Sequence, residues 1–487
     1  MVKGFVEEKE ATSRFQVAME QFGRKEYRLC IQALDECLNQ LDLGSDHAAA
    51  IQPVNDKAFR SASEFASKVF ITRAICNFNL AVLSGEKEKR TVYLNRAIAD
   101  FDHVIETYVP FKDHFSEVVS TREGKNMYLS CIKAYSLKGR CLNELADGDK
   151  TMAEEAVKCF SGAIGMTEEL KKHDHTTTID GSLPQLYSDR GICFTHAGDY
   201  ENASADFSST IGFLHNNQHV EMAQAYHNRA VSGAAARKFE DAASDFTTAI
   251  ANYQSIMENG VSSSKISETH HERARCLYKL VNSSVEKYKS DKSHELAKSI
   301  LKNNKQASED YDKLLTMKGD QEHLLKKRYQ NMLISSACCL DGHVSKDEIT
   351  FMFEKAIPII KSNISHNPSN SKSQLDLARC MTKLRGDPQE IVKLYDKCLH
   401  LLPKDFSEEL KGSIFFERGV VKTRVPELTD GSLSDFTSAL SLNRRLSEAF
   451  YNRSLLYFRK EDFVSALKDI EVAVDINKAD VEYFLIM

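Results

Sequence analysis

Two stretches of the chain repeat each other so closely that they restrict the fold to one kind of unit. Residues 186–211 read LYSDRGICFTHAGDYENASADFSSTI, and residues 225–250 read AYHNRAVSGAAARKFEDAASDFTTAI. When Gly191 is aligned with Ala230, the two copies match in kind at almost every apolar position. An internal repeat with a period of about 20–50 residues is typical of arrays in which one small structural unit is stacked many times.

Each copy has the pattern of two helices joined by a turn. In the first copy, apolar residues recur at spacings of four and three before Gly198 and at spacings of four after it, which is the helical period. Gly198 tolerates the left-handed conformation that ends a helix, and Asp199 is a residue that caps the next one. The small residues Gly191 and Ala203 mark where the two helices approach closely, and Phe207 fills the space between them.

One such hairpin cannot bury its own apolar face, so neighbouring hairpins must stack. The pattern resembles the tetratricopeptide repeat, a helix–turn–helix unit of roughly 34 residues. The resemblance covers the aromatic, small and second aromatic residues of the first helix (helix A) and the Ala and Phe of the second (helix B). The Trp of the family pattern is missing, since the chain has no Trp, and Tyr or Phe stands in its place. The resemblance implies an all-α fold, a right-handed α–α solenoid of stacked hairpins.

The pattern extends over most of the 487 residues and predicts about ten hairpins. We expect an N-terminal array over residues 12–255, with long insertions between helices, and a C-terminal array over residues 266–487. The two form either one continuous superhelix or two arms with a hinge near residues 259–265. Residues 480–487, DVEYFLIM, fall where a further helix A would begin, which favours a truncated chain or docking onto the last hairpin over oligomerisation.

Three places are expected to lengthen the hairpins. The stretch SGEKEKRTVY at residues 84–93 and the region around Gly148 have the composition of long turns. Residues 283–300 separate two helical patterns widely enough to suggest an extra helix plus a loop.

The alignment also predicts an ion pair inside some hairpins. Where helix A carries Arg just before its small residue, helix B carries Asp just before its large one, and in the four other hairpins both are missing. The expected pairs are Arg73–Asp100, Arg190–Asp206, Arg229–Asp245, Arg273–Asp310, Arg418–Asp435 and Arg453–Asp469. A partly exposed pair contributes about 0.2–1 kcal/mol, so these pairs are expected to be structural rather than part of a binding site.

Charge and cysteine content restrict the possible partners and compartment. The net charge is −6 and no block of Lys and Arg stands out, which argues against nucleic acid or an anionic membrane as the main partner. The twelve Cys are scattered without a C-x-x-C pair, which favours a reducing compartment such as the cytoplasm. The start MVKGFVEEKE lacks the apolar core of a signal peptide, and no apolar run approaches the length of a membrane span.

The resemblance implies that helix A lines a concave face where peptides commonly bind. Residues of helix A that do not face the core are therefore the candidates for a peptide-binding groove, and aromatic side chains beside Arg and Lys suit a segment with acidic and apolar residues. The candidates are Phe416, Val420, Arg424, Tyr451, Leu455, Phe458, Arg459, Lys372, Arg379 and Lys383. The alternative is that the apolar members are ordinary core residues and the charged ones a solvated face.

Some members of the family bind the acidic C-termini of heat-shock chaperones through a clamp of Lys and Asn residues. Asn228 and Asn452 match the middle Asn of that clamp, but the helix before Asn228 offers Ser188 and Ile192 instead of Lys and Asn. The following helix offers Glu268 where a cation is needed. The clamp is thus absent, and a co-chaperone role becomes the weaker alternative.

No catalytic or metal-binding constellation is recognisable. His173 with His175, and the adjacent His270 and His271, lack Cys or carboxylate partners at a known ligand spacing. The adjacent Cys338 and Cys339 are more often packing residues than redox ones. No phosphate-binding loop, nucleophile elbow or H-E-x-x-H motif is present, and no cofactor is expected.

The sequence therefore favours a non-catalytic scaffold or adaptor that holds a peptide segment of a partner in its groove. The alternative is a structural subunit of a larger assembly, and an enzyme with an unrecognised site is the weakest hypothesis. The partner's identity and the oligomeric state stay open.

Overall fold

The computed structural model describes residues 2–40, 57–108, 115–173, 183–215, 217–256, 263–316 and 322–477. Every regular element in these ranges is helical, and the residues divide into two compact units, Met1–Thr269 and His270–Met487. Three features discussed above lie wholly or partly outside the described residues, namely His175, the hinge residues 259–262 and the C-terminal residues 480–487.

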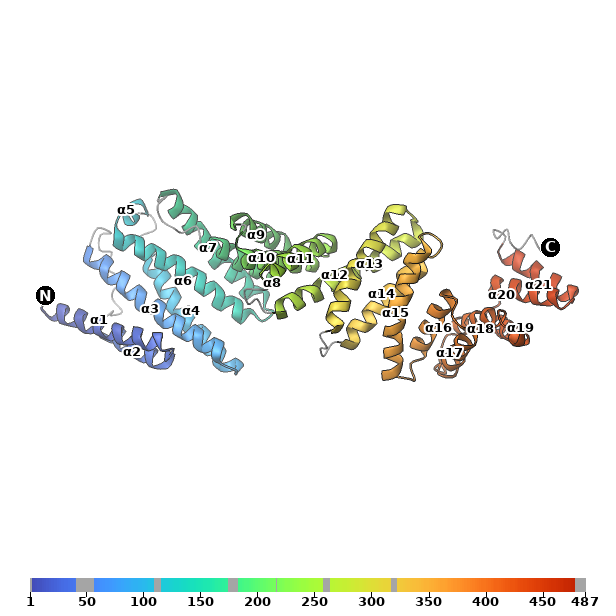
Figure 1. The fold of residues 1–487 in the computed structure, drawn as a ribbon. Coiled ribbons are helices and arrows are strands. Elements are labelled where there is room, and N and C mark those ends of the chain that lie inside the picture. Colours follow the sequence, from blue (N-terminus) through green and yellow to red (C-terminus); the bar gives the residue numbers. More distant parts are fainter. Residues whose placement is uncertain are drawn as a thin grey trace. The chain divides into compact units, whose positions relative to one another are not determined.

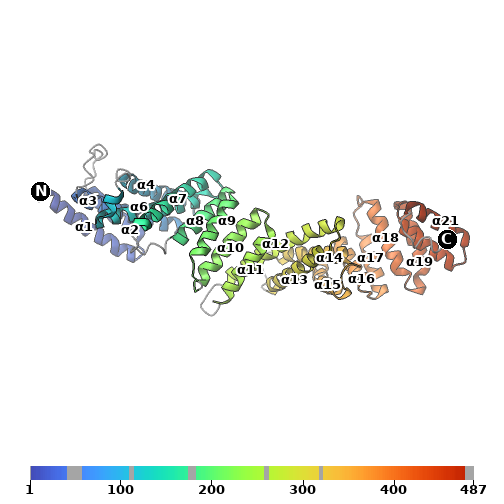
Figure 2. The same cartoon turned by 90° about the horizontal axis from the view of Figure 1, so that it is seen from above.

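The first unit is a row of antiparallel hairpins (Figure 1). Its helices are α1 (Val2–Gly23), α2 (Tyr27–Gln40), α3 (Lys57–Leu83), α4 (Lys87–Tyr108), the short α5 (Phe115–Val119), α6 (Arg122–Ala146), α7 (Lys150–His173), α8 (Leu183–Ala197), α9 (Tyr200–Phe213), α10 (His219–Ala235) and α11 (Phe239–Gln254). Seen from above, α8, α9, α10 and α11 lie side by side in chain order (Figure 2).

The second unit continues the pattern with the hairpins of the C-terminal half. Its helices are α12 (Ser263–Ser290), most of which belongs to this unit, α13 (His294–Thr316), α14 (Glu322–Leu340), α15 (Lys346–His366), α16 (Ser371–Lys383), α17 (Pro388–His400), α18 (Glu408–Lys422), the 3₁₀ turn η3 (Pro426–Leu428), α19 (Thr429–Leu442), α20 (Ser447–Arg459) and α21 (Phe463–Ile476). With the exception of α5 and η3, the described helices pair into ten hairpins, as the repeat pattern predicts.

Stacking follows the same rule throughout each unit. A helix B packs against helix A of its own hairpin and against helix A of the next one, as α9 does with α8 and α10. Each helix B therefore has apolar residues on two sides, which is why single hairpins cannot be stable alone.

The α8–α9 turn forms as its residues predict. Gly198 adopts φ +81°, the left-handed conformation expected after the end of α8. The Asp199 carboxylate accepts a hydrogen bond from the backbone N–H of Asn202 and so caps α9.

The three predicted insertions are wrong, because their residues extend the helices instead. Helix α4 begins at Lys87, so most of the stretch 84–93 is helical, and the turn around Gly148 is only three residues long, between α6 and α7. Charged residues such as these suit the exposed face of a helix as well as a loop, which is why composition misled.

The third insertion, residues 283–300, divides between the end of α12 and the start of α13. Val285 and Tyr288 continue the buried face of α12, and Ala297 and Ile300 begin that of α13. The sixth hairpin therefore has two long helices and a short turn, without an extra helix.

Candidate functional site

All six predicted ion pairs form, and all have the same geometry. In each hairpin the Arg of helix A donates two N–H hydrogen bonds to the two carboxylate oxygens of the Asp of helix B, over 2.5–3.0 Å. Such two-pronged bonds fix the orientation as well as the distance of the two side chains. The pairs are more buried than a surface pair, and the Asp310 carboxylate is fully enclosed.

The same arginines also contact a third helix, which the repeat alignment does not predict. In five hairpins the remaining guanidinium nitrogen donates to a residue on helix B of the preceding hairpin, over 2.6–3.3 Å. The acceptors are Asp35, Ser161, Ser208, Asp396 and Thr437, and each stands two residues after the position of the paired Asp. The recurrence of Ser, Thr or Asp at that position is the feature of the sequence from which these contacts could be predicted. Each of these arginines therefore connects two successive hairpins.

The aromatic residue of helix A lies against the same arginines. Tyr187 lies under the guanidinium of Arg190 at 5.4 Å, and Tyr226 under that of Arg229 at 5.2 Å. The aromatic position of the repeat thus stabilises the cation through the ring face as well as contributing apolar surface.

In three of the hairpins a glycine of helix A packs closely against a phenylalanine of helix B. A Cβ atom on Gly191 would lie 2.8 Å from the Phe207 ring, and one on Gly139 or Gly419 would lie 2.7 Å from the ring of its own partner, Phe160 or Phe436. These distances leave no room for a side chain on helix A, so the small–large pairing predicted from the sequence is confirmed. The hairpins have the helix A–helix B packing that the resemblance to tetratricopeptide repeats predicts. Their helices A and B stack as an α–α solenoid within each unit.

Comparisons with known proteins gave matches to solved structures. No family model and no curated protein matches the chain. Among solved structures, the chain is similar to yeast Tom70 (15% identity, covering 98% of this chain and 94% of that one, TM-score 0.28). It is also similar to the Cut9–Hcn1 tetramer of the APC/C (10% identity, 96% and 93% covered, TM-score 0.31) and to the TPR2AB domain of yeast Sti1 (14%, 62% and 94%, 0.24).

Two of the candidate groove cations are already engaged by other repeats. Arg379 of α16 donates two hydrogen bonds, of 2.7 and 2.9 Å, to the carboxylate of Glu417 in α18. Lys383 forms an ion pair of 2.5 Å with Asp341. The equivalent bridge in the first unit joins Arg140 of α6 to Asp189 of α8 at 2.8 Å. At these places the charges of helix A connect repeats, which reduces their availability to a partner.

The candidates on α18 and α20 have a different environment. Phe416 is half-buried, with its ring 5.9 Å from that of Phe436 in the core, while Arg424 and Arg459 are exposed. Phe458 is 53% exposed and its ring lies 5.5 Å from that of Phe463. The other three candidates on these helices, Val420, Tyr451 and Leu455, are half-buried, and Lys372 on α16 is exposed.

A buried carboxylate that the sequence did not single out lies between α14, α15 and α16. Asp376 accepts a hydrogen bond of 2.9 Å from the side-chain amide of Gln330, whose oxygen accepts one of 2.8 Å from Asn363. Burial raises the pKa of Asp376, and the positive charges of Lys372 and Arg379 only partly oppose that rise.

This raised pKa predicts a pH dependence of stability. Because the folded-state pKa lies above the unfolded value of about 3.9, the folded protein binds the proton of the Asp376 carboxyl more tightly than the unfolded chain does. The group therefore favours folding more as the pH falls from above the folded-state pKa to below the unfolded value. We expect the stability advantage of Asp376→Asn over the wild type to shrink from pH 7 toward about pH 4. Urea unfolding at several pH values checks this, with exposed Asp405→Asn as the matched control. A difference independent of pH would contradict the prediction.

The histidines considered as metal ligands have other surroundings. His270 is buried and its Nδ1 lies 2.6 Å from a carboxylate oxygen of Asp310. The ring of His173 packs edge-on against Phe115, and the Nδ1 of His271 lies 3.6 Å from Glu272. Among the described residues no group of three His, Cys, Asp or Glu side chains is placed to hold a metal ion.

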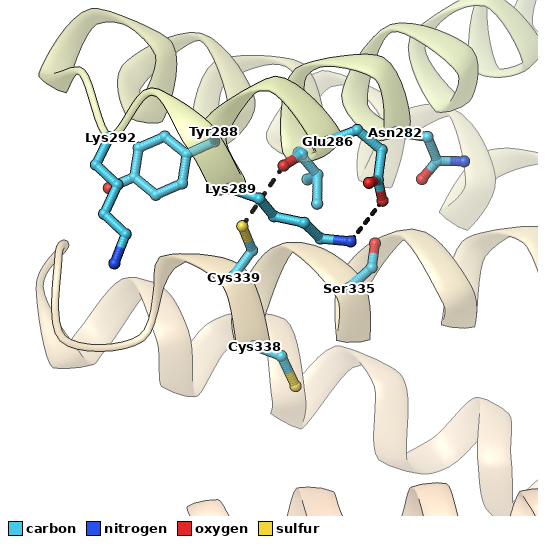
Figure 3. Close-up of a pocket in the computed structure, with 9 residues that line it drawn as sticks. Asn282, Glu286, Tyr288, Lys289, Lys292, Ser335, Cys338 and Cys339 are labelled. Carbon is cyan, nitrogen blue, oxygen red and sulfur yellow. Dashed lines mark hydrogen bonds and ion pairs between the residues drawn. The ribbon is translucent and has the colours of Figure 1, made fainter. Parts of the chain in front are cut away.

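The adjacent cysteines border a pocket of about 540 Å³ between α12 and α14 (Figure 3). Cys339 points toward α12, where its thiol donates to the backbone carbonyl of Val285, whereas Cys338 points away on the other side of α14. Lys289 in the same pocket pairs with Glu286 at 2.7 Å. Burial raises the pKa of both thiols, so neither is an activated nucleophile.

One described helix is long and apolar enough to cross a membrane by composition alone, namely residues Ser63–Leu83 of α3. Half of this stretch is buried inside the protein, and it carries Arg73 in its ion pair with Asp100. It has the packing of a core helix, with α2, α4 and α6 around it.

Proposed function

We propose that the protein is a non-catalytic scaffold, and that its last two repeats hold a partner segment with acidic and apolar residues. The proposed groove consists of residues on α18 and α20, together with one residue just after α18, Arg424. The full set is Phe416, Val420, Arg424, Tyr451, Leu455, Phe458 and Arg459. The twelve cysteines, all without a disulfide, fit a reducing compartment such as the cytoplasm.

A row of cations at one repeat position supports this proposal. Lys383, Arg424 and Arg459 each stand five residues after the small residue of their helix A. Lys383 is paired with Asp341, whereas Arg424 and Arg459 are exposed and form no ion pair with another described residue. Two exposed cations on successive repeats, neither of them paired with a described residue, attract carboxylates at a matching spacing.

The neighbouring side chains supply the apolar part of the groove. Val420 and Leu455 stand one residue after the small residue of their helices, where α16 carries Arg379 instead. The exposed ring of Phe458 adds an aromatic contact of the kind that dominates protein interfaces. An acidic segment with bulky apolar residues fits this combination of charge and surface.

Reversing the two exposed charges tests the proposal. We expect Arg424→Glu with Arg459→Glu to weaken binding by at least about tenfold, because like charges facing an acidic segment repel it. Fluorescent peptides of random sequence, arrayed and probed with the purified protein, provide the ligands, and the wild type is expected to select acidic and apolar ones. Circular dichroism confirms that the variant is folded.

The matched control is Arg444→Glu with Arg445→Glu. These two arginines are exposed in the turn between α19 and α20, so they change the net charge equally while standing before a helix A rather than at its C-terminal end. We expect this variant to keep the affinity of the wild type. Equal losses in the two variants would indicate a general charge effect, and no loss in either would refute the groove.

A further inference from the structure

The thiols of Cys30 in α2 and Cys76 in α3 lie in contact, with a distance of 3.4 Å between the two sulfur atoms. Both side chains are fully buried, and they belong to successive repeats. All twelve cysteines are among the described residues, and no other two of them are in hydrogen-bonding contact. We propose that Cys30 and Cys76 are a dithiol that small-molecule disulfides oxidise, forming a crosslink between the first and second repeats.

The surroundings hold the two sulfur atoms in place. Arg73, three residues before Cys76 on α3, donates a hydrogen bond of 2.6 Å to Asp35 on α2. This contact fixes the two helices against each other about one turn from the thiols. A disulfide bond is about 2.05 Å long, so the sulfur atoms must approach by a little over 1 Å, which small side-chain rotations supply.

The thiol–thiol hydrogen bond also distinguishes the two sulfur atoms in the closed repeat. Cys76 donates to the Cys30 sulfur, and this bond lowers the pKa of Cys30. In the closed repeat Cys30 is therefore the more acidic thiol of the two. The other cysteine in the same cluster, Cys37, donates its S–H to the carbonyl of Ala11 instead, and burial raises its pKa to about 11.

An oxidant reaches these buried sulfurs through opening of the first repeat. Among the described helices, the α1–α2 hairpin packs on one neighbouring repeat, through α2 against α3 and through the ring of Phe15 against that of Phe65. Terminal units open locally far more often than the whole array unfolds. The same opening exposes both thiols, and closing brings them together again.

The chemistry balances with one disulfide, RSSR, as the oxidant. The Cys30 thiolate attacks one sulfur of RSSR, forming a mixed disulfide and releasing RS⁻, which takes up a proton. The Cys76 thiol then loses its proton to solvent, and its thiolate attacks the Cys30 sulfur, expelling the second RS⁻. Two protein thiols are oxidised to one disulfide, and RSSR is reduced to two RSH.

Oxidised glutathione provides the test on the 487-residue chain. Cys338→Ser with Cys339→Ser removes the two cysteines that are not fully buried, leaving ten. After incubation, remaining thiols are alkylated in denaturant and counted by mass spectrometry. We expect the count to fall from ten to eight, without retained glutathione, and peptide mapping to show the Cys30–Cys76 link. Ten remaining thiols, retained glutathione or a different link would refute the proposal.

Single variants separate the crosslink from general reactivity. Cys76→Ser is expected to leave Cys30 carrying one glutathione, since the second step has no attacking thiol. Cys141→Ser, which removes an equally buried cysteine of α6, is expected to form the crosslink as before. In the oxidised protein, amide hydrogen exchange in α2 is expected to slow by about tenfold or more, because opening of the closed loop is restricted. Unchanged exchange would also count against the crosslink.

Discussion

Replacing Asp310 by alanine is expected to destabilise the sixth repeat by about 3–5 kcal/mol, the cost of leaving a buried charge without its partner. The Asp310 carboxylate is 0% exposed and accepts two hydrogen bonds from Arg273, of 2.9 and 2.7 Å, and one of 2.6 Å from His270. The Arg273 side chain is only 7% exposed, so water has little access to it once the Asp310 carboxylate is removed. Amide hydrogen exchange in α12 and α13 measures the loss locally, which an array of repeats requires.

The matched control is Asp245→Ala, which breaks the same pair in the fifth repeat. There the Asp245 and Arg229 side chains are 16% and 26% exposed, so water reaches the guanidinium when the carboxylate is removed. We expect a loss of about 1 kcal/mol at this position. Replacing both Arg273 and Asp310 by apolar residues is expected to cost less than Asp310→Ala alone. Equal losses at Asp310 and Asp245 would show that burial does not decide the effect.

The sequence predicted the parts of this fold that repeat. The stripes of apolar residues, the turn at Gly198 and the six Arg–Asp pairs all follow from a pattern that recurs along the chain, so one copy checks another. Helix lengths do not recur in this way. Residues 283–300 were assigned wrongly because only packing against neighbouring helices decides whether a charged, partly apolar stretch remains helical.

The candidate site was less predictable because its charges depend on contacts between repeats. The sequence shows that Arg379 lies on helix A, but not that Glu417 of the next repeat binds it. The same holds for the buried Asp376, whose amide partners come from two other helices. The Arg424 and Arg459 positions could be predicted, since they follow the small residue at a constant spacing. That neither arginine forms an ion pair with another described residue required the structure.

Phe207→Ala is expected to destabilise the fourth repeat by about 3–5 kcal/mol, as truncation of a fully buried aromatic ring does. Phe207 is 1% exposed, and its ring fills the space that Gly191 leaves on α8. Gly191 has no side chain that could move into the cavity, so the loss is expected at the upper end of that range. Hydrogen exchange in α8 and α9, together with urea unfolding, measures it.

Two further variants decide whether ring volume is the cause. Phe207→Leu keeps most of the volume and is expected to lose less than about 2 kcal/mol, whereas Glu201→Ala, exposed in the first turn of the same helix α9, is expected to change stability by less than about 0.5 kcal/mol. Because each helix B packs against two helices A, the loss at Phe207 is also expected to increase exchange in α10, the next helix A. A Phe207→Ala variant as stable as Glu201→Ala would show that the glycine–phenylalanine contact does not hold the repeats together.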